Sequence, residues 1–226
     1  MRLPVADDRR GEMDIAIIGA GNVGRALAGS IIRAGHAVTI SASNPAHARA
    51  VAQATGAQPA NSNREAMQRA QAVVLAIPTP ALEQVLAGEG DALAGRIVID
   101  ATNRVDPTNP GKMIDGSSNA EYIQQRIPEA RVVKAFNTAL AARMDEPTVD
   151  GMQLDGYVAS DDEAAKAQVL ALVGAIGFRP IDVGQLSMAR ALEAMALLNI
   201  TIQMQHNLPW EAGFRLVGPM GRTFAE

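Results

Sequence analysis

The feature that most constrains this chain is an apolar run that leads directly into three spaced glycines. The run Ile15–Ile18 is followed by Gly19-Ala20-Gly21-Asn22-Val23-Gly24, and a helix-like stretch continues to Ala34. A strand, a G-x-G-x-x-G turn and a helix in this order are the context of a dinucleotide-binding turn. Gly19 would permit the tight turn, Gly21 would let a pyrophosphate approach the backbone, and Gly24 would let the helix pack closely on the sheet. The motif therefore predicts that residues 19–24 hold a dinucleotide at the N-terminus of the first helix.

Composition narrows the class of protein. A chain of 226 residues can bury one sizeable core. Its net charge is −4 and no basic run is present, which argues against a nucleic-acid partner. The lack of cysteine excludes disulfides, iron–sulfur clusters and thiol nucleophiles. No segment has the apolar length of a membrane span. We therefore expect a cytoplasmic protein without a membrane or nucleic-acid partner.

The first twelve residues differ from the rest of the chain. They are polar and contain no apolar core of the kind that a signal peptide requires. We interpret residues 1–12 as a disordered or extended leader, and Met13 as a candidate for the natural start.

Several later segments have the length and composition of buried strands. Continuous rather than alternating apolarity indicates strands covered on both faces, as in a parallel sheet. The connections between them are long enough for helices, and Asn44-Pro45 predicts a capped helix that runs to about Thr55. The predicted strands are residues 37–41, 72–77, 96–100, 131–135, 156–160 and 178–183, and further helices are expected over residues 120–126, 162–176 and 186–205.

These elements predict an α/β fold with a doubly wound, mostly parallel sheet and a small helical C-terminal appendage. The stretch from Asn103 to Gly116 is rich in Pro, Gly, Asn and Asp, and is predicted to be a loop. We divide the chain into a dinucleotide-binding domain over residues 13–145 and a C-terminal part over residues 146–226 that completes the sheet.

The end of the second strand bears on the choice of cofactor. A NAD-selective site places Asp or Glu there to bind the ribose 2′-hydroxyl. No Asp or Glu occurs from Ile15 through Arg64, and the strand ends in neutral donors. A helix N-terminus next to them favours an anion, although Ser-Asn-Pro is equally a simple helix cap. We therefore predict NADP(H) rather than NAD(H), with the 2′-phosphate near Ser41, Ser43, Asn44 and His47.

Further motifs resemble a known family. Val132-Val133-Lys134-Ala135-Phe136-Asn137-Thr138 matches the V-V-K-A-F-N-T stretch at the family's fifth strand, and Ala76-Ile77-Pro78 and Asp100-Ala101-Thr102-Asn103 match two other strand ends. The segment from Gly184 to Glu193 is similar to the family's G-x-L-x-x-A-R-x-x-E pattern. From Met13 to Gln205, the chain resembles the NADPH-dependent reductases of 8-hydroxy-5-deazaflavin (coenzyme F-420). It is similar in the same places to the cytosolic reductase domain of the membrane ferric reductases.

The resemblance implies a Rossmann-type domain, usually a homodimer, that binds NADP(H) across the strand ends. It places the pyrophosphate at Ala20 to Gly24 and the 2′-phosphate at Ser43, Asn44 and His47. It implies a nicotinamide site lined by Ile77, Pro78, Thr79, Ala101, Thr102, Asn137 and Ala141. Family members commonly carry arginine at the position of Ser43, and archaeal deazaflavin reductases carry histidine at the position of Asn137.

No side chain stands out as a catalytic acid or base. Lys134 resembles the catalytic lysine of the 3-hydroxyacid dehydrogenases, but it lies within a predicted strand. Those enzymes also carry a large helical domain that is not predicted here, so Lys134 is not expected to be catalytic. Asp100, at a strand end, is expected to orient a loop through backbone hydrogen bonds. Three histidines without cysteine give no metal-site spacing, so no metal is predicted. The Met-rich last helix is expected to pack in the core or in a dimer interface.

The predicted activity is hydride transfer between NADP(H) and a small-molecule planar ring acceptor, with the deazaflavin first. Such a transfer needs two rings held face to face and little acid–base machinery. Three alternatives stay open: an NADPH-dependent flavin or ferric reductase, a reductase of a small imine or ketone, and a non-catalytic NADP-binding sensor or subunit.

Overall fold

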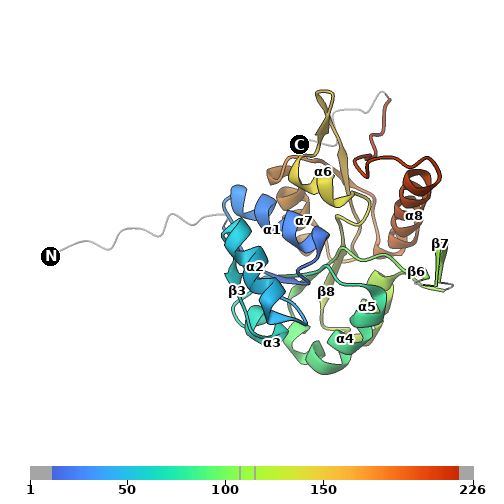
Figure 1. Ribbon diagram of the computed structural model, residues 1–226. Coiled ribbons are helices and arrows are strands. Elements are labelled where there is room, and N and C mark those ends of the chain that lie inside the picture. Colours follow the sequence, from blue (N-terminus) through green and yellow to red (C-terminus); the bar gives the residue numbers. More distant parts are fainter. Residues whose placement is uncertain (1–11, 107, 115, 219–226) are drawn as a thin grey trace.

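The computed structural model describes residues 12–106, 108–114 and 116–218, so the predicted leader lies almost entirely outside the described residues. In this part of the chain, six strands form one parallel sheet in the order β3-β2-β1-β4-β5-β8 (Figure 1). Their bounds are β1 Asp14–Ile18, β2 Ala37–Ser41, β3 Gln58–Pro59, β4 Ala72–Leu75, β5 Ile97–Asp100 and β8 Arg131–Lys134.

Helices cover both faces of this sheet. Alternate residues of each strand point to opposite sides, so Ile15 and Ile17 of β1 join one core cluster, whereas Ala16 and Ile18 join the other. Continuous apolar strands are thus explained by burial on both faces, as predicted. The first face packs against α1 Asn22–Arg33, α2 Pro45–Thr55, α6 Ala141–Asp145 and α7 Glu163–Ala175; the second packs against α3 Asn63–Met67, α4 Thr79–Leu93 and α5 Asn119–Arg126.

The strand order places a crevice at the carboxyl ends of two central strands. From β1 the chain moves outward to β2 and β3, then returns to the other side of β1 with β4. Ligands of open α/β sheets bind at such a reversal of strand order, outside the carboxyl ends of the strands. The loops after β1 and β4 therefore form the expected position of a nucleotide site.

The C-terminal part adds a second, smaller sheet beside β8. β11 Asp155–Val158 and β12 Arg179–Asp182 pair in parallel, and one antiparallel bridge from Lys134 to Ala159 joins them to β8. A short antiparallel pair, β9 Thr148–Val149 and β10 Met152–Gln153, precedes them. The last helix, α8 Ala189–Gln205, follows a 3₁₀ turn over Leu186–Met188. The domain division at residue 145 remains a prediction.

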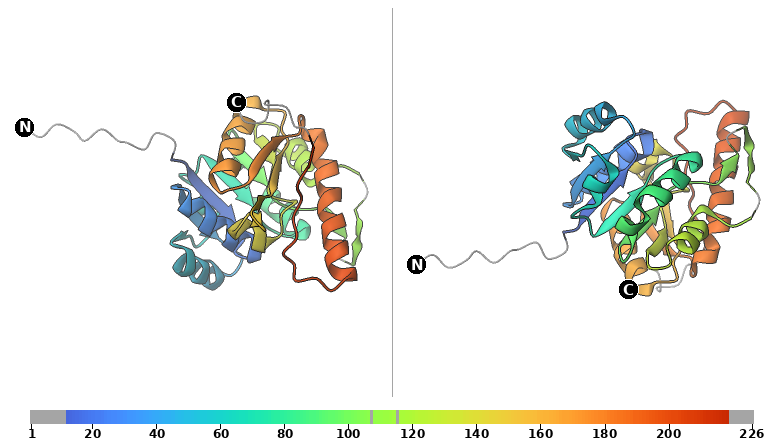
Figure 2. Two further views of the ribbon diagram at one scale, coloured as in Figure 1. Left: turned by 90° about the horizontal axis from the view of Figure 1, so that it is seen from above. Right: turned by 90° about the horizontal axis from the view of Figure 1, so that it is seen from below.

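One prediction about local structure was wrong. The segment expected to be a loop contains an antiparallel hairpin, β6 Val105–Asp106 with β7 Asn109–Met113. Both views of Figure 2 show this hairpin alongside α8, against which β7 packs. Its Pro- and Gly-rich composition is tolerated because a two-stranded ribbon consists of edge strands, whose outward N–H groups need no partner in a sheet. The Pro, Gly, Asn and Asp residues of this segment indicated a turn, but they gave no indication of the short strands on either side of it.

The other predicted elements agree closely with the structure. β2 spans the predicted residues, and α2 begins at Pro45 with Asn44 as its cap. Ser118 forms a reciprocal capping box with Glu121 at the start of α5. No helix within the described ranges is long and apolar enough to cross a membrane.

Candidate functional site

The glycine turn between β1 and α1 has the geometry that each of its glycines predicts. Gly19 has φ 115°, and a Cβ there would lie 2.2 Å from the carbonyl oxygen of Ala76. A Cβ on Gly24 would lie 1.9 Å from the carbonyl oxygen of Gly19, so only glycine allows this approach of helix and strand. At Gly21, in contrast, no atom lies within 4 Å of the position that a Cβ would take. This open space next to the first turn of α1 suits a pyrophosphate that needs unpaired backbone N–H groups.

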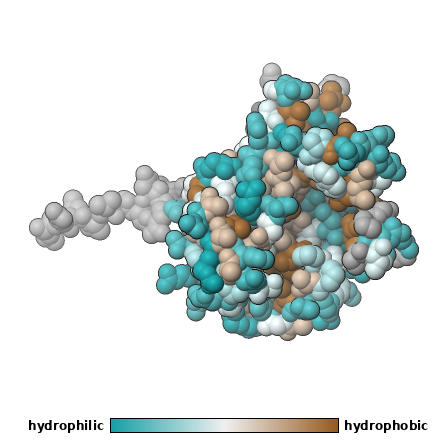
Figure 3. Space-filling view, viewed as in Figure 1, coloured by the Kyte–Doolittle hydropathy of each residue, from teal (hydrophilic) through white to brown (hydrophobic). Residues whose placement is uncertain are grey.

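A cleft of about 450 Å³ opens from this turn. Its lining comes from the glycine turn, from the segment between β2 and α2 with the first turn of α2, from the loop after β4, and from α3 and α4. Figure 3 shows brown, apolar side chains gathered near the centre of the face seen in Figure 1, between polar surfaces on either side. The cleft is lined by Ile18, Gly19, Ala20, Gly21, Ala42, Ser43, His47, Asn63, Ala76, Ile77, Pro78, Ala81, Gln84, Val85 and Glu89.

The residues predicted for the 2′-phosphate take different positions around this cleft. Ser43 and His47 line it. Asn44 caps α2, with its Oδ1 accepting from the Ala46 N–H at 2.9 Å, so the cap interpretation holds. Ser41 is fully buried, and its hydroxyl donates to Oδ1 of Asn63 at 2.7 Å. Among the described lining residues, only His47 can carry a positive charge.

The residues predicted for the nicotinamide end follow the carboxyl ends of β4, β5 and β8. Ile77 and Pro78 line the cleft, Thr79 is the first residue of α4, and Ala101 and Thr102 follow β5. The remaining two predicted residues lie after β8: Asn137 is on the loop that leads into α6, and Ala141 is the first residue of that helix.

Hydrogen bonds connect several of these residues. The Nδ2 group of Asn119 donates to the hydroxyls of Thr79 at 3.1 Å and of Thr102 at 2.7 Å. The Nδ2 group of Asn137 donates to Oδ1 of Asn103 at 2.9 Å, and Nδ2 of Asn103 donates back to the Asn137 carbonyl at 3.2 Å. Asn119 therefore links Thr79 with Thr102, and two hydrogen bonds with Asn103 hold Asn137 in place.

The loop that carries Asn137 is conformationally unusual. Phe136, next to it, has φ 66°, a left-handed conformation that is uncommon for a bulky residue. The Asn137 side chain is buried, with 5% of the residue exposed. Its Oδ1 atom nevertheless has no hydrogen-bond partner in the described part of the chain. Strained backbone and an unpaired buried acceptor both concentrate at binding sites.

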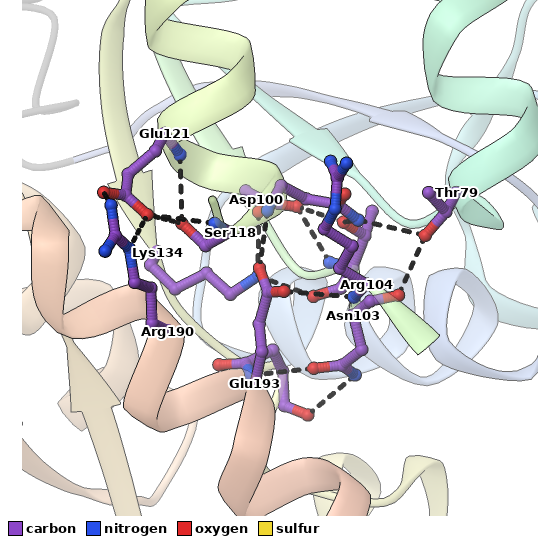
Figure 4. Close-up of polar contacts among 12 residues, drawn as sticks. Thr79, Asp100, Asn103, Arg104, Ser118, Glu121, Lys134, Arg190 and Glu193 are labelled. Atoms are coloured by element: carbon purple, nitrogen blue, oxygen red, sulfur yellow. Dashed lines mark hydrogen bonds and ion pairs between the residues drawn. The ribbon is translucent and has the colours of Figure 1, made fainter. Parts of the chain in front are cut away.

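A buried ionic cluster lies directly beneath these strand ends (Figure 4). Nζ of Lys134 contacts Oδ2 of Asp100 at 2.8 Å and Oε1 of Glu193 at 2.7 Å, and all three side chains are fully buried. Nζ also donates to the Thr102 carbonyl at 2.6 Å, which uses all three of its protons. Burial raises the pKa of Glu193 above its ordinary value, and the nearby Asp100 adds to this effect while Lys134 opposes it.

The two carboxylates of this cluster hold loop backbone. Oδ1 of Asp100 accepts from the N–H of Thr102 at 2.9 Å and from its hydroxyl at 2.6 Å, the loop-orienting role expected for this residue. Glu193, on α8, accepts from the backbone N–H groups of Asn119 at 2.9 Å and Arg104 at 3.1 Å. Next to it, Arg190 of α8 forms two hydrogen bonds with Glu121. These contacts fix α8 to the loop that follows β5 and to the first turn of α5.

Sequence reasoning missed several residues of this region. Asn119 and Asn103 carry hydrogen bonds of predicted site residues, but neither was predicted as a site residue. Asn103 ends the Asp100–Asn103 motif, which could have indicated it, whereas nothing in the local sequence of Asn119 distinguishes it from a turn residue. A second cavity of about 230 Å³ lies next to Thr79 and Asn119 and is also lined by Leu82, Glu83, Arg104, Ile114 and Tyr122. No group of His, Asp and Glu suited to a metal ion occurs in the described residues.

Comparison with known proteins identifies relatives over a large part of the chain. Residues 14–104 match the family described as NADP oxidoreductase coenzyme F420-dependent. The F420-dependent NADP reductase of Methanothermobacter marburgensis is 30% identical over 164 residues, which cover 69% of this chain and 72% of that protein. A crystal structure from Arthrobacter sp. FB24 that carries the name of an F420-dependent NADP reductase superposes with a TM-score of 0.82 at 28% identity, covering 91% of this chain and all of that one.

A metalloreductase is similar over much of the same region. The metalloreductase STEAP3 of Rattus norvegicus is 30% identical over 187 residues, which cover 81% of this chain. This chain spans only 36% of that protein's length, so the similarity concerns one part of the relative.

Proposed function

Because the chain belongs to the family of coenzyme F420-dependent NADP oxidoreductases, we propose that it transfers a hydride between NADP(H) and a planar ring acceptor, and that this acceptor is the 8-hydroxy-5-deazaflavin coenzyme. NADP(H) supplies or accepts the hydride at its nicotinamide ring. The glycine turn would hold the pyrophosphate, and Ser43, Asn44 and His47 would face the 2′-phosphate. The neutral residues at the ends of β4, β5 and β8 would line the nicotinamide.

One observation carries the choice of a ring acceptor. The only ammonium group at the described strand ends, Lys134, is enclosed by Asp100, Glu193 and the Thr102 carbonyl. A ketone or imine needs a proton from a positioned acid as the hydride arrives. A ring acceptor needs chiefly correct placement, which fixed neutral side chains can provide.

The arrangement of cavities supports the same proposal. Pro78 lines the cleft beside the glycine turn and the next residue, Thr79, lines the 230 Å³ cavity, so the two spaces meet at the start of α4. A dinucleotide in the first would bring its ring toward Thr79, next to a separate space for an acceptor. The lining of that space is mixed, with apolar Leu82 and Ile114 beside the guanidinium of Arg104.

The direct test mixes the protein, NADPH and oxidised deazaflavin, and follows loss of the deazaflavin absorption band. Free flavin is run in parallel because a flavin is the alternative ring acceptor. We expect bleaching of the deazaflavin. Bleaching of flavin alone would replace the deazaflavin by a flavin, and bound NADPH with no transfer to either ring would favour a small imine or ketone substrate or a non-catalytic role.

A variant of the nicotinamide end tests the mechanism. Asn137→Ala removes the amide that pairs with Asn103 and should lower kcat on the order of 100-fold, the cost of a misplaced ring. Asn63→Ala, in the part of the cleft lining that contacts Ser41, is the matched control: it should change KM for NADPH with little effect on kcat. Equal effects of the two variants on kcat would contradict the assignment of the ring site.

A further inference from the structure

The carboxylate of Glu193 lies between two segments that line the second cavity, the space of about 230 Å³ next to Thr79. Its Oε2 atom accepts from the backbone N–H of Arg104 at 3.1 Å, and its Oε1 atom accepts from the backbone N–H of Asn119 at 2.9 Å. Arg104 and Asn119 both line the cavity. Glu193 itself is fully buried, and Nζ of Lys134 contacts the same Oε1 atom at 2.7 Å (Figure 4). One side chain of the last helix therefore holds the backbone at two points of the cavity wall.

Arg104 and Asn119 each carry a polar atom that the protein leaves unpaired. Nε of Arg104 is buried and has no hydrogen-bond partner in the described part of the chain, and the same is true of Oδ1 of Asn119. The Nδ2 group of Asn119 donates to the hydroxyls of Thr79 and Thr102, which fixes the orientation of the amide and leaves Oδ1 over. Buried polar atoms normally have partners. A donor and an acceptor that lack them on two lining residues of one cavity indicate a ligand.

The other polar groups of the cavity are already occupied. The hydroxyl of Tyr122 donates to the carboxylate of Glu83, and the hydroxyl of Thr79 donates to a backbone carbonyl at 2.9 Å. Apolar side chains, Leu82 and Ile114, supply further parts of the lining. A ligand suited to this space therefore has an apolar body with a hydrogen-bond acceptor beside a hydrogen-bond donor.

We infer that Glu193 is a positioning residue for the acceptor: it holds Arg104 and Asn119 so that the guanidinium donates to a carbonyl oxygen and the amide oxygen accepts from the adjoining N–H of a cyclic imide. The inference rests on the proposed transfer to a planar ring, because the pyrimidinedione ring of a deazaflavin or a flavin carries an N–H between two carbonyl groups. A guanidinium beside such a carbonyl also stabilises the negative charge that the ring gains with a hydride. A simple ketone has no N–H and would leave Oδ1 of Asn119 unpaired.

The first test compares the oxidised deazaflavin with its 3-methyl analogue, in which a methyl group replaces the imide hydrogen. Binding of each ring to the protein saturated with NADP⁺ is followed by the fluorescence of the deazaflavin, so that no hydride transfer takes place. A buried acceptor left without a donor costs on the order of tenfold to a hundredfold in affinity, and the wild type should prefer the parent ring by about that factor. Asn119→Ala should abolish the preference. Equal dissociation constants of the two rings in the wild type would overturn the inference.

Glu193→Gln tests the positioning role. Its amide can keep the oxygen toward Lys134 and the Asn119 N–H and turn the amino group toward the Arg104 N–H, because the reverse orientation would face two donors. The variant should therefore weaken binding of both rings about tenfold and retain the preference for the parent. In the background of Arg104→Met the same change should cost less than about twofold, because the guanidinium that it displaces is absent. An equal loss in both backgrounds would indicate a merely structural role and overturn the inference.

Arg190→Gln is the control on the same helix, because its ion pair of 2.7 Å with Glu121 lies outside the cavity. It should keep the dissociation constants of NADP⁺ and of both rings within about twofold of the wild type. A loss as large as that of Glu193→Gln would overturn the inference, as would a parallel loss of NADP⁺ affinity in Glu193→Gln itself, measured by calorimetry. Circular dichroism verifies that each variant is folded.

The two proposals fail in different ways. A protein that discriminates between the two rings but does not reduce the deazaflavin with NADPH would refute the proposed reaction alone. A protein that reduces the deazaflavin but binds both rings equally would refute the role of Glu193, Arg104 and Asn119 alone.

Discussion

Replacing Lys134 with methionine should remove about 3–5 kcal/mol from the free energy of unfolding at pH 7, the usual cost of breaking a buried ion pair by removing one partner. The side chain is fully buried and makes three short contacts, of 2.8 Å to Asp100, 2.7 Å to Glu193 and 2.6 Å to the Thr102 carbonyl. Methionine retains most of the volume and supplies no charge. Two carboxylates would then share a closed space without a cation.

The loss should depend on pH in a defined direction. Burial already raises the pKa of Glu193 in the folded protein, and removal of the ammonium that opposes this shift should raise it further. A carboxyl whose folded pKa exceeds its unfolded pKa binds its proton more tightly when folded, so the protein loses stability as pH rises through the folded value. Lowering the pH from neutral toward the ordinary carboxyl pKa should therefore recover part of the stability of the variant.

Urea unfolding of both proteins at pH 7 and pH 5.5 measures this effect. Arg64→Ala is the matched control, since it breaks an ion pair of 2.7 Å with Asp91 in which both side chains are largely exposed; it should shift the midpoint little. A Lys134 variant that is as stable as this control, or one whose deficit is the same at both pH values, would refute the account of the cluster.

Three further predictions concern the cofactor, the assembly and a helix end. Ser43→Arg should strengthen NADPH binding by about 1–3 kcal/mol without helping NADH, because it adds a charge-assisted contact to the 2′-phosphate; calorimetry with both nucleotides measures it, and an equal gain for NADH would contradict the placement. Leu198 and Ile202 leave 53% and 39% of their surface exposed on α8, so we predict a homodimer that buries this face; light scattering should give a dimer mass for the wild type and a monomer mass for Leu198→Lys, and a wild-type monomer at micromolar concentration would count against it. Asn44→Ala should cost about 1 kcal/mol through loss of the α2 cap, as read from denaturant unfolding, whereas Asn44→Asp should retain the cap.

Much of the local structure of the chain could be predicted from its sequence. Strands buried on both faces appear as continuous apolar runs, and a capped helix start appears as Asn44-Pro45, because each depends on neighbouring residues. The glycine turn was predictable for the same reason, since the left-handed φ of Gly19 and the tight contact at Gly24 arise within a few residues. The hairpin of β6 and β7 was not, because its support comes from α8, some eighty residues later in the chain.

The sequence alone thus determined the type of fold, the parallel sheet with its glycine turn, and the family of the protein. Only the tertiary structure decided how the predicted residues are used. It engaged Ser41 in a buried hydrogen bond with Asn63. It also enclosed Lys134 of β8 between Asp100 of β5 and Glu193 of α8, and brought residues of separate elements together in the lining of one cleft. The physical reason is that the type of a residue fixes which hydrogen bonds it can donate or accept. Its burial and its actual partners depend on how segments that are distant in the sequence pack together.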